Sequence, residues 1–331
     1  MTELIERPAS FGPEGTLFGL LSQAASESPT GIGCLVLNTG ANHRIGPHRI
    51  NVKIARRLAG VGVPTLRFDL SGIGDSPSAQ TTQSFRTQAV ADMKAAMDHM
   101  EDSLGLHRFL VFGICSGAEN GLAIALADPR VVGLMTLDGA IYLTRTARIE
   151  RKLRRWAAFP VNGAVRRSYA WWRDLASAAS GDAEGRAKTL QRLRSTFLPG
   201  ANSAPNANIF EADTPWVSAE EHGHKLSTLL DRGVALCMLY SATYNSSDRN
   251  RGMLGQLAGA PYLERIDYRY MNDVDHTATT LEMQGKLLGA IEAWATSVAK
   301  RTPPQQQQTF AARTRPTAEA KLSALKEAVS I

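Results

Sequence analysis

The sequence predicts an α/β protein in which helices cover both faces of a mostly parallel sheet. Short apolar runs typical of buried strands alternate with longer segments whose apolar residues recur at helical spacing. The pattern Gly113-Ile-Cys115-Ser-Gly117 lies where one such run meets a helical segment, and His276 follows the last run. With 44% hydrophobic and 21% charged residues, the chain also has the composition of a globular protein.

The first half of the chain contains most of the strand patterns. The run Gly-Cys-Leu-Val-Leu at 33–37 is apolar throughout, as strands buried on both faces of a parallel sheet are. The opening runs, at 9–11 and 15–21, flank a Gly-Pro-Glu turn and predict a hairpin. The same criteria predict further strands at 64–68 and 108–112, and helices at 51–58, 84–100 and 116–127.

In the second half of the chain, the alternation of predicted strands and helices is interrupted and then resumes. Strands are expected at 131–137, 234–240 and 266–271, followed by a helix at 277–299. Between them, from 141 to 216, tryptophans and a tyrosine recur among arginines without a strand run. We therefore expect a core formed by 1–140 and 217–300, with a basic helical cap at 141–216 inserted after the sixth strand. The tail, 301–331, is rich in glutamine and proline near its start, and we expect it to be disordered.

The Gly-x-Cys-x-Gly pattern is that of the nucleophile elbow of α/β-hydrolases, with Cys115 replacing the usual serine. The elbow holds its central residue in a strained conformation, and side chains two residues away would collide with backbone, which explains Gly113 and Gly117. An ordinary turn with an inert buried cysteine would share the pattern. Ser116 is the competing nucleophile, but the β-branched Ile114 would then occupy a glycine position. We therefore expect Cys115 to be the nucleophile.

A cysteine nucleophile needs a base, and the base needs an orienting group. In α/β-hydrolases the chain order is nucleophile, acid, histidine, which makes His276 the expected base. The acid should follow the strand at 234–240, where Asp248 is the nearest carboxylate. Asn245 is the first alternative, because Cys-His-Asn triads also work. Asp138, which follows the strand at 131–137, is the third choice.

The remaining site residues are expected in the loop after the strand at 33–37. The oxyanion hole of such a site uses the amide after the nucleophile, here that of Ser116, and one from this loop, for which we choose Ala41. His43, Arg44 and Arg49 follow closely and are candidates for binding an anionic part of the substrate. The alternative is that they simply coat the surface.

Several segments together resemble the exosortase A system-associated hydrolases. They are HRIGPHRINVKIARRLAGVGVPTLRFDLSGIGDS, the elbow GICSGA, SYAWWRDLASAASG in the insertion, and DHT at 275–277. The resemblance covers about residues 5–298. It implies the α/β-hydrolase fold, a cap and an acyl-hydrolase type of triad. The chain departs from it at the acid, because related sequences carry aspartate where this chain has Tyr244.

Charge is concentrated in the predicted cap. From 145 to 194 there are eleven arginines and two lysines against four acidic residues, a larger positive excess than the formal +6 of the whole chain. A solvated helical face would explain this, as would an anionic substrate, an acidic carrier protein or a membrane surface. No nucleic-acid-binding motif accompanies the charge, so we expect no nucleic-acid partner.

Three functions follow in order of preference. The first is an esterase or thioesterase that forms an acyl intermediate on Cys115, with the acyl group delivered as an ester or as a thioester of coenzyme A or acyl carrier protein. The second is an acyltransferase that passes the acyl group to an alcohol or amine. The third is a catalytically weak module that binds an acyl ligand or a partner. No cofactor or metal is expected, since the three cysteines lack metal spacing. With no leader or apolar span visible, we expect a cytoplasmic protein.

Overall fold

The computed structural model describes residues 3–25, 30–147, 149, 217–242 and 251–301 of the chain. Within these ranges eight strands form one sheet in the order β1-β2-β4-β3-β5-β6-β7-β8. The first two strands are antiparallel, and β2 also pairs antiparallel with β4, whereas all later pairs are parallel. The strands are β1 Leu4–Phe11, β2 Leu17–Ala24, β3 Gly33–Val36, β4 Thr65–Phe68, β5 Phe109–Ile114, β6 Val131–Leu137, β7 Ala235–Ser241 and β8 Asp267–Met271.

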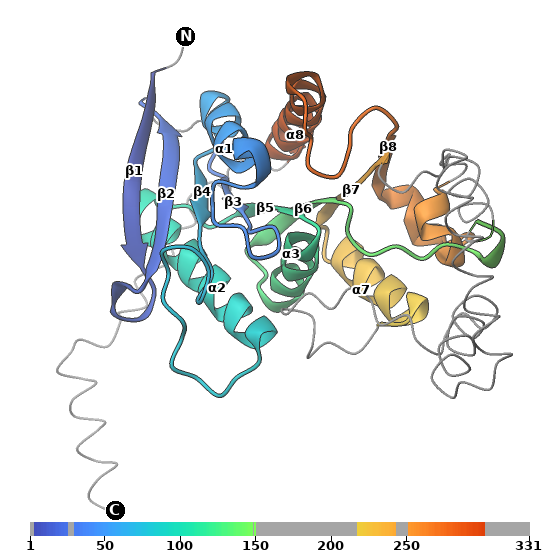
Figure 1. Cartoon of the computed structure of the whole chain (residues 1–331), viewed down its shortest axis with the longest axis horizontal. Coiled ribbons are helices and arrows are strands. Elements are labelled where there is room, and N and C mark those ends of the chain that lie inside the picture. The colour runs from blue at the N-terminus through green and yellow to red at the C-terminus, as the bar shows by residue number, and fades with distance from the viewer. Residues whose placement is uncertain (1–2, 26–29, 148, 150–216, 243–250, 302–331) are drawn as a thin grey trace, which may run out of the picture.

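Helices cover the sheet on both faces (Figure 1). On one face lie α1 (Ile50–Gly60) and α8 (Leu281–Arg301), which share an apolar cluster with the strand residues beneath them. On the other face lie α2 (Phe85–Leu104), α3 (Ser116–Ala127) and α7 (Ala219–Asp231), which contribute to a second cluster. The central strands are buried from both sides, and all six residues of β5 are buried. This explains why these strands are apolar throughout instead of alternating.

Polar side chains fix where two of the helices begin. The hydroxyl of Ser84 accepts the amide of Thr87 at the start of α2, and that of Ser218 accepts the amide of Glu221 at the start of α7. Such caps satisfy amides that the first helical turn leaves unpaired. Helix α2 ends at Gly105, whose φ of 67° is the left-handed conformation that glycine adopts without strain. Short 3-10 turns (Pro13–Gly15, Pro47–Arg49, Gly252–Leu257 and Pro261–Arg265) complete the described elements.

The predicted fold class is confirmed, with differences at particular elements. β1 begins at Leu4 instead of residue 9, because its exposed half carries polar residues that hide the strand pattern. Helix α7 was not predicted, and α8 begins at Leu281, four residues after the predicted start. The expected cap lies outside the described residues from 150 to 216, and so does the expected tail after Arg301. Among the described helices, none combines the length and apolar character needed to cross a membrane.

Candidate active site

Cys115 lies on a sharp turn between β5 and α3, with φ 57° and ψ −115°. A positive φ is strained for any residue with a side chain, and such strain concentrates at functional sites. The turn is possible only because its neighbours are glycines. A Cβ on Gly113 would lie 2.1 Å from the carbonyl oxygen of Gly117, and one on Gly117 would lie 2.6 Å from that of Asn38. The backbone therefore has the elbow geometry that the sequence predicts.

Three further polar residues lie at the carboxyl ends of the strands beside β5. Asp138 follows β6, Ser241 ends β7, and His276 lies in the loop after β8. The Nδ1 of His276 is 2.8 Å from Oδ2 of Asp138, and the side chain of His276 also hydrogen-bonds that of Cys115. Because Nδ1 is engaged by the carboxylate, Nε2 remains for the sulfur. Parallel neighbouring strands end at the same edge of the sheet, so residues 138 positions apart meet there.

The carboxylate of Asp138 is held in place by donors from β7. Its side chain is fully buried, and it accepts the amide of Ser241 at 2.7 Å and the hydroxyl of Ser241 at 2.5 Å. Together with His276, these donors satisfy both carboxylate oxygens, as a buried charge requires. The backbone of Asp138 has φ 51°, a second strained residue at this edge. Ser241 is therefore a part of the site that no sequence pattern indicated.

The loop that carries His276 is fixed by hydrogen bonds of its own. Oδ1 of Asp275 accepts the amides of Thr277 and Thr279, at 3.0 and 3.1 Å. The buried Gln284 of α8 donates its side-chain amide to the carbonyl oxygen of Ala278 at 3.0 Å. These contacts fix the loop that holds the imidazole between Asp138 and Cys115.

The surroundings of His276 favour its charged form. The hydrogen bond to Asp138, and after it the one to Cys115, raise the pKa of His276 to about 10 against the opposing effect of burial. The imidazole is therefore an imidazolium at neutral pH. The sulfur of Cys115 lies beside this imidazole, at the start of α3.

Of the three candidates for the orienting acid, the structure describes one. Asp138, the third choice from sequence, is the carboxylate that contacts His276. Asp248 and Asn245, the first two choices, lie at 243–250, outside the described residues. The signal for Asp138 was present, because it directly follows an apolar strand and therefore lies at the same sheet edge as Cys115. The usual chain order of the fold instead predicts the acid after the next strand.

On the opposite side of the elbow, the loop after β3 reaches the start of α3. The amide of Gly40 donates to the hydroxyl of Ser116 at 2.7 Å. Gly40 belongs to a turn closed by a hydrogen bond from the amide of Asn42 to the carbonyl oxygen of Thr39. Ala41, the expected loop donor, is exposed in this turn. The loop amide that contacts the elbow is therefore that of Gly40, and the oxyanion role of the Ala41 amide stays a prediction.

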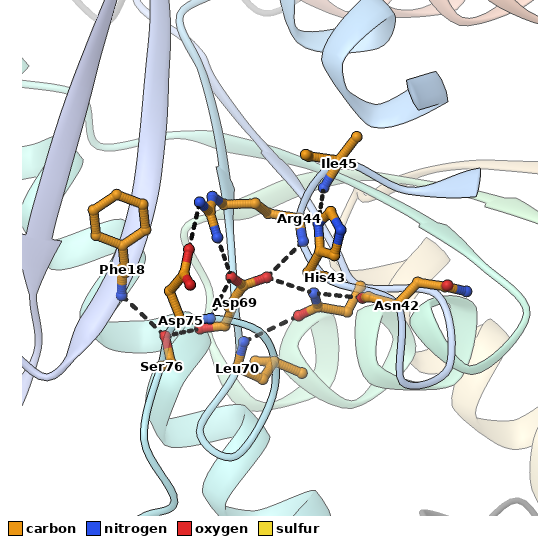
Figure 2. Close-up of polar contacts among 10 residues, drawn as sticks. Phe18, Asn42, His43, Arg44, Ile45, Asp69, Leu70, Asp75 and Ser76 are labelled. Carbon is orange, nitrogen blue, oxygen red and sulfur yellow. Dashed lines mark hydrogen bonds and ion pairs between the residues drawn. The ribbon is translucent and has the colours of Figure 1, made fainter. Parts of the chain in front are cut away.

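A buried carboxylate ties this loop to the loop after β4 (Figure 2). Asp69 accepts hydrogen bonds from the side-chain amide of Asn38 (3.2 Å), the backbone amide of Arg44 (2.5 Å) and that of Asp75 (3.1 Å). The guanidinium of Arg44 contacts Asp69 and Asp75 at 2.5 and 2.6 Å. It also lies over the ring of Phe18, 4.5 Å from the ring centre. This cluster fixes the loop that carries Gly40.

The three residues predicted to bind an anion have different surroundings in the structure. Arg44 is turned inward, because its charge is neutralised by Asp69 and Asp75, and it therefore supports the loop instead of facing a ligand. His43 and Arg49 are exposed. The Nδ1 of His43 accepts the amide of Ile45 at 3.3 Å.

Replacing Asp69 by alanine is expected to lower the free energy of unfolding by about 3–5 kcal/mol, because it removes a buried charge and leaves its donors unpaired. Asp75→Ala is the matched control, since it removes the other partner of Arg44. The Asp75 side chain is 64% exposed, so this loss should stay below about 1 kcal/mol. Urea unfolding of both variants measures the difference, and equal losses would contradict the structural role given to Asp69.

Comparisons with known proteins agree with the fold. A family model described as alpha/beta hydrolase fold matches residues 35–274. A Klebsiella pneumoniae protein provisionally assigned as a dienelactone hydrolase is 14% identical, with a TM-score of 0.51 over 89% of this chain and 99% of that one. A Pyrococcus furiosus esterase is 12% identical, with a TM-score of 0.50 over 90% of this chain and 92% of the esterase. No curated protein sequence matches this chain. At these identities the solved structures establish the similarity of fold alone.

Proposed function

Because the chain belongs to the α/β-hydrolase fold family, we propose that it is an acyl-transfer enzyme that hydrolyses an ester or thioester through Cys115, His276 and Asp138. One observation carries the proposal: a single imidazole, that of His276, hydrogen-bonds both the elbow cysteine and a buried carboxylate. A nucleophile, a base and an orienting acid connected in this way are the arrangement that covalent acyl transfer requires.

Acylation begins with the thiolate of Cys115. Its sulfur attacks the carbonyl carbon of the substrate, and the carbonyl electron pair moves onto oxygen to give a tetrahedral oxyanion. As this intermediate collapses, the bond to the leaving alcohol or thiol breaks and the imidazolium of His276 gives that group its proton. The result is an acyl thioester on Cys115 and a neutral His276. The buried carboxylate of Asp138 keeps Nδ1 protonated, so Nε2 is the nitrogen that exchanges the proton.

Deacylation uses the same residues in reverse. Neutral His276 takes a proton from a water molecule while the water oxygen attacks the acyl carbon. The carbon–sulfur bond of the intermediate then breaks, which releases a carboxylic acid and restores the thiolate–imidazolium pair. An alcohol or amine in place of water would give an acyltransferase by the same proton movements. The lifetime of the acyl enzyme with and without an acceptor therefore distinguishes the two activities.

The geometry around His276 supports Asp138 as the acid over Asp248. One Nδ1–H is available, and it lies 2.8 Å from an Asp138 oxygen that is buried and fixed by Ser241. A second carboxylate would have to compete for the same proton. The departure of this chain from its resemblance at Tyr244 then removes no essential group, because the acid stands after β6 and not after β7.

The substrate we infer carries a negative group near its carbonyl end. His43 and Arg49 are exposed in the segment between β3 and α1 that also carries Gly40, and the guanidinium of Arg49 supplies a positive charge there. The phosphates of coenzyme A, or of the phosphopantetheine arm of a carrier protein, have the matching charge.

Turnover of a substrate panel tests the proposal. The full-length protein is incubated with nitrophenyl esters, coenzyme A thioesters and N-acetylcysteamine thioesters of increasing chain length. We expect hydrolysis, with a lower KM for coenzyme A thioesters than for their uncharged counterparts. Slow release that accelerates on addition of an alcohol or amine would indicate the acyltransferase. Neither turnover nor an acyl adduct, from protein shown to be folded, would overturn the proposal and favour a binding module.

A further inference from the structure

The hydroxyl of Ser116 lies on the side of the elbow where an oxyanion is normally held. α/β-hydrolases hold the oxyanion between the amide after the nucleophile and an amide of the loop after the third strand. Here the loop amide aimed at the elbow is that of Gly40, and the group it meets at 2.7 Å is the Ser116 hydroxyl. This side chain therefore stands between the loop donor and the space next to Cys115.

The contact between Gly40 and Ser116 is set by rigid backbone. Residue 117 must be glycine because a Cβ there would lie 2.6 Å from the carbonyl oxygen of Asn38, so the loop packs directly on the first turn of α3. Asn38 in turn donates to Asp69 and accepts the amide of Leu70 at 3.0 Å. The loop has little freedom to withdraw from Ser116 and offer the Gly40 amide directly to a ligand.

The Ser116 hydroxyl can accept one hydrogen bond and donate another at the same time. A serine oxygen that accepts one hydrogen bond still has its own proton to donate. Accepting the Gly40 amide polarises the O–H bond and makes it a better donor. The Ser116 side chain is partly exposed, so the proton can be directed toward a bound substrate.

We propose that Ser116 supplies two donors to the oxyanion, its backbone N–H and its side-chain O–H, and that the Gly40 amide acts through the hydroxyl. This rests on the proposed function and names a further catalytic residue within it. When the thiolate attacks, the carbonyl electron pair moves onto oxygen and the hydrogen bond from Ser116 strengthens, while its proton stays on the serine. The site would then favour carbonyl oxygen over sulfur, because sulfur accepts hydrogen bonds weakly.

A pair of substrates that differ in one atom tests this role. An aryl ester and the matching thionoester, in which sulfur replaces the carbonyl oxygen, are compared in wild type, Ser116→Ala and Ser116→Thr. We expect Ser116→Ala to lower kcat for the oxygen ester by about 10²-fold, as loss of one oxyanion donor does elsewhere. Its KM should change little, and its preference for the oxygen ester over the thionoester should fall. Ser116→Thr keeps the hydroxyl. Its kcat for the oxygen ester and its preference for the oxygen ester over the thionoester should therefore both stay close to the wild-type values.

Thr39→Val is the matched control. It removes a hydroxyl one residue before Gly40, and that hydroxyl is buried without a partner among the described residues. This variant should keep the wild-type substrate preference. If Ser116→Ala fails to fold, Ser116→Gly also removes the hydroxyl and answers the same question.

The outcomes separate this inference from the function on which it rests. A wild-type substrate preference in Ser116→Ala, at whatever rate, would show that the hydroxyl only supports the loop and would overturn the inference alone. A wild-type enzyme that neither turns over esters nor acquires an acyl group would overturn both. A lowered preference that Ser116→Thr restores supports the direct contact.

Discussion

Replacing Cys115 by alanine is expected to abolish ester and thioester turnover, with a loss of about 10⁶-fold in kcat, as removal of a triad nucleophile does in other enzymes. Alanine has no atom that can form the acyl bond, and the neighbouring Ser116 hydroxyl is engaged with the Gly40 amide instead of with His276. The measurement is turnover of the best substrate of the panel. The protein should remain folded, because alanine is smaller and the strained turn depends on Gly113 and Gly117.

Cys237→Ala is the matched control for this loss. The chain has three cysteines, and Cys34 and Cys237 are buried in strands whereas Cys115 is partly exposed. Burial raises the pKa of the Cys237 thiol, which keeps it protonated and unreactive. Cys237→Ala should therefore retain wild-type turnover. Activity that survives Cys115→Ala but disappears in Ser116→Ala would show that the nucleophile is the serine and that the elbow assignment is wrong.

Replacing Asp138 by asparagine is expected to lower kcat/KM by about 10²–10⁴-fold. In serine proteases the equivalent change costs about 10⁴-fold, because an amide no longer fixes the productive tautomer of the histidine. A thiolate is intrinsically more nucleophilic than a hydroxyl, so a smaller loss is expected here. Asp248→Asn is the decisive comparison, because sequence order alone points to that residue. It should leave kcat/KM close to the wild-type value, and the reverse result would place the acid after β7.

The pH dependence of kcat/KM tests the role of Asp138 in a second way. His276 must be protonated to give its proton to the leaving group, and its pKa is raised to about 10 chiefly by Asp138. Wild-type kcat/KM should therefore hold through neutral pH and fall as pH rises through about 10. In Asp138→Asn the main cause of the raised pKa is gone, so this alkaline limb should move to lower pH. A limb that stays in place would contradict the coupling between the two residues.

Sequence reasoning reached the parts of the site that have a local pattern. The elbow is local, because the glycines at 113 and 117 are needed to avoid specific backbone collisions that the structure shows. His276 is nearly local, because it follows the last strand and precedes the last helix. The fold class followed for a similar reason, since strands buried from both sides are apolar throughout and stand out in the sequence.

The parts of the site that the sequence does not predict depend on which strand ends lie side by side in the sheet. Asp138 and His276 are brought together by the pairing of β6, β7 and β8, and chain order alone ranked Asp248 above Asp138. Ser241 had no signal at all, because a serine at a strand end is common. The contact of Gly40 with Ser116 depends on how the loop after β3 packs on α3, and no sequence pattern indicates it.

The position of the acyl group on the chain tests the role of Cys115 as nucleophile most directly. Full-length protein is exposed briefly to activated esters and acyl thioesters, quenched in acid, and examined by intact mass and peptide mapping. We expect one added acyl group, located on Cys115 and absent from Cys115→Ala. It should persist longer in His276→Ala, where water is no longer activated, if that variant still acylates. An acyl group on Ser116, or turnover without any acyl enzyme at Cys115, would contradict the central claim.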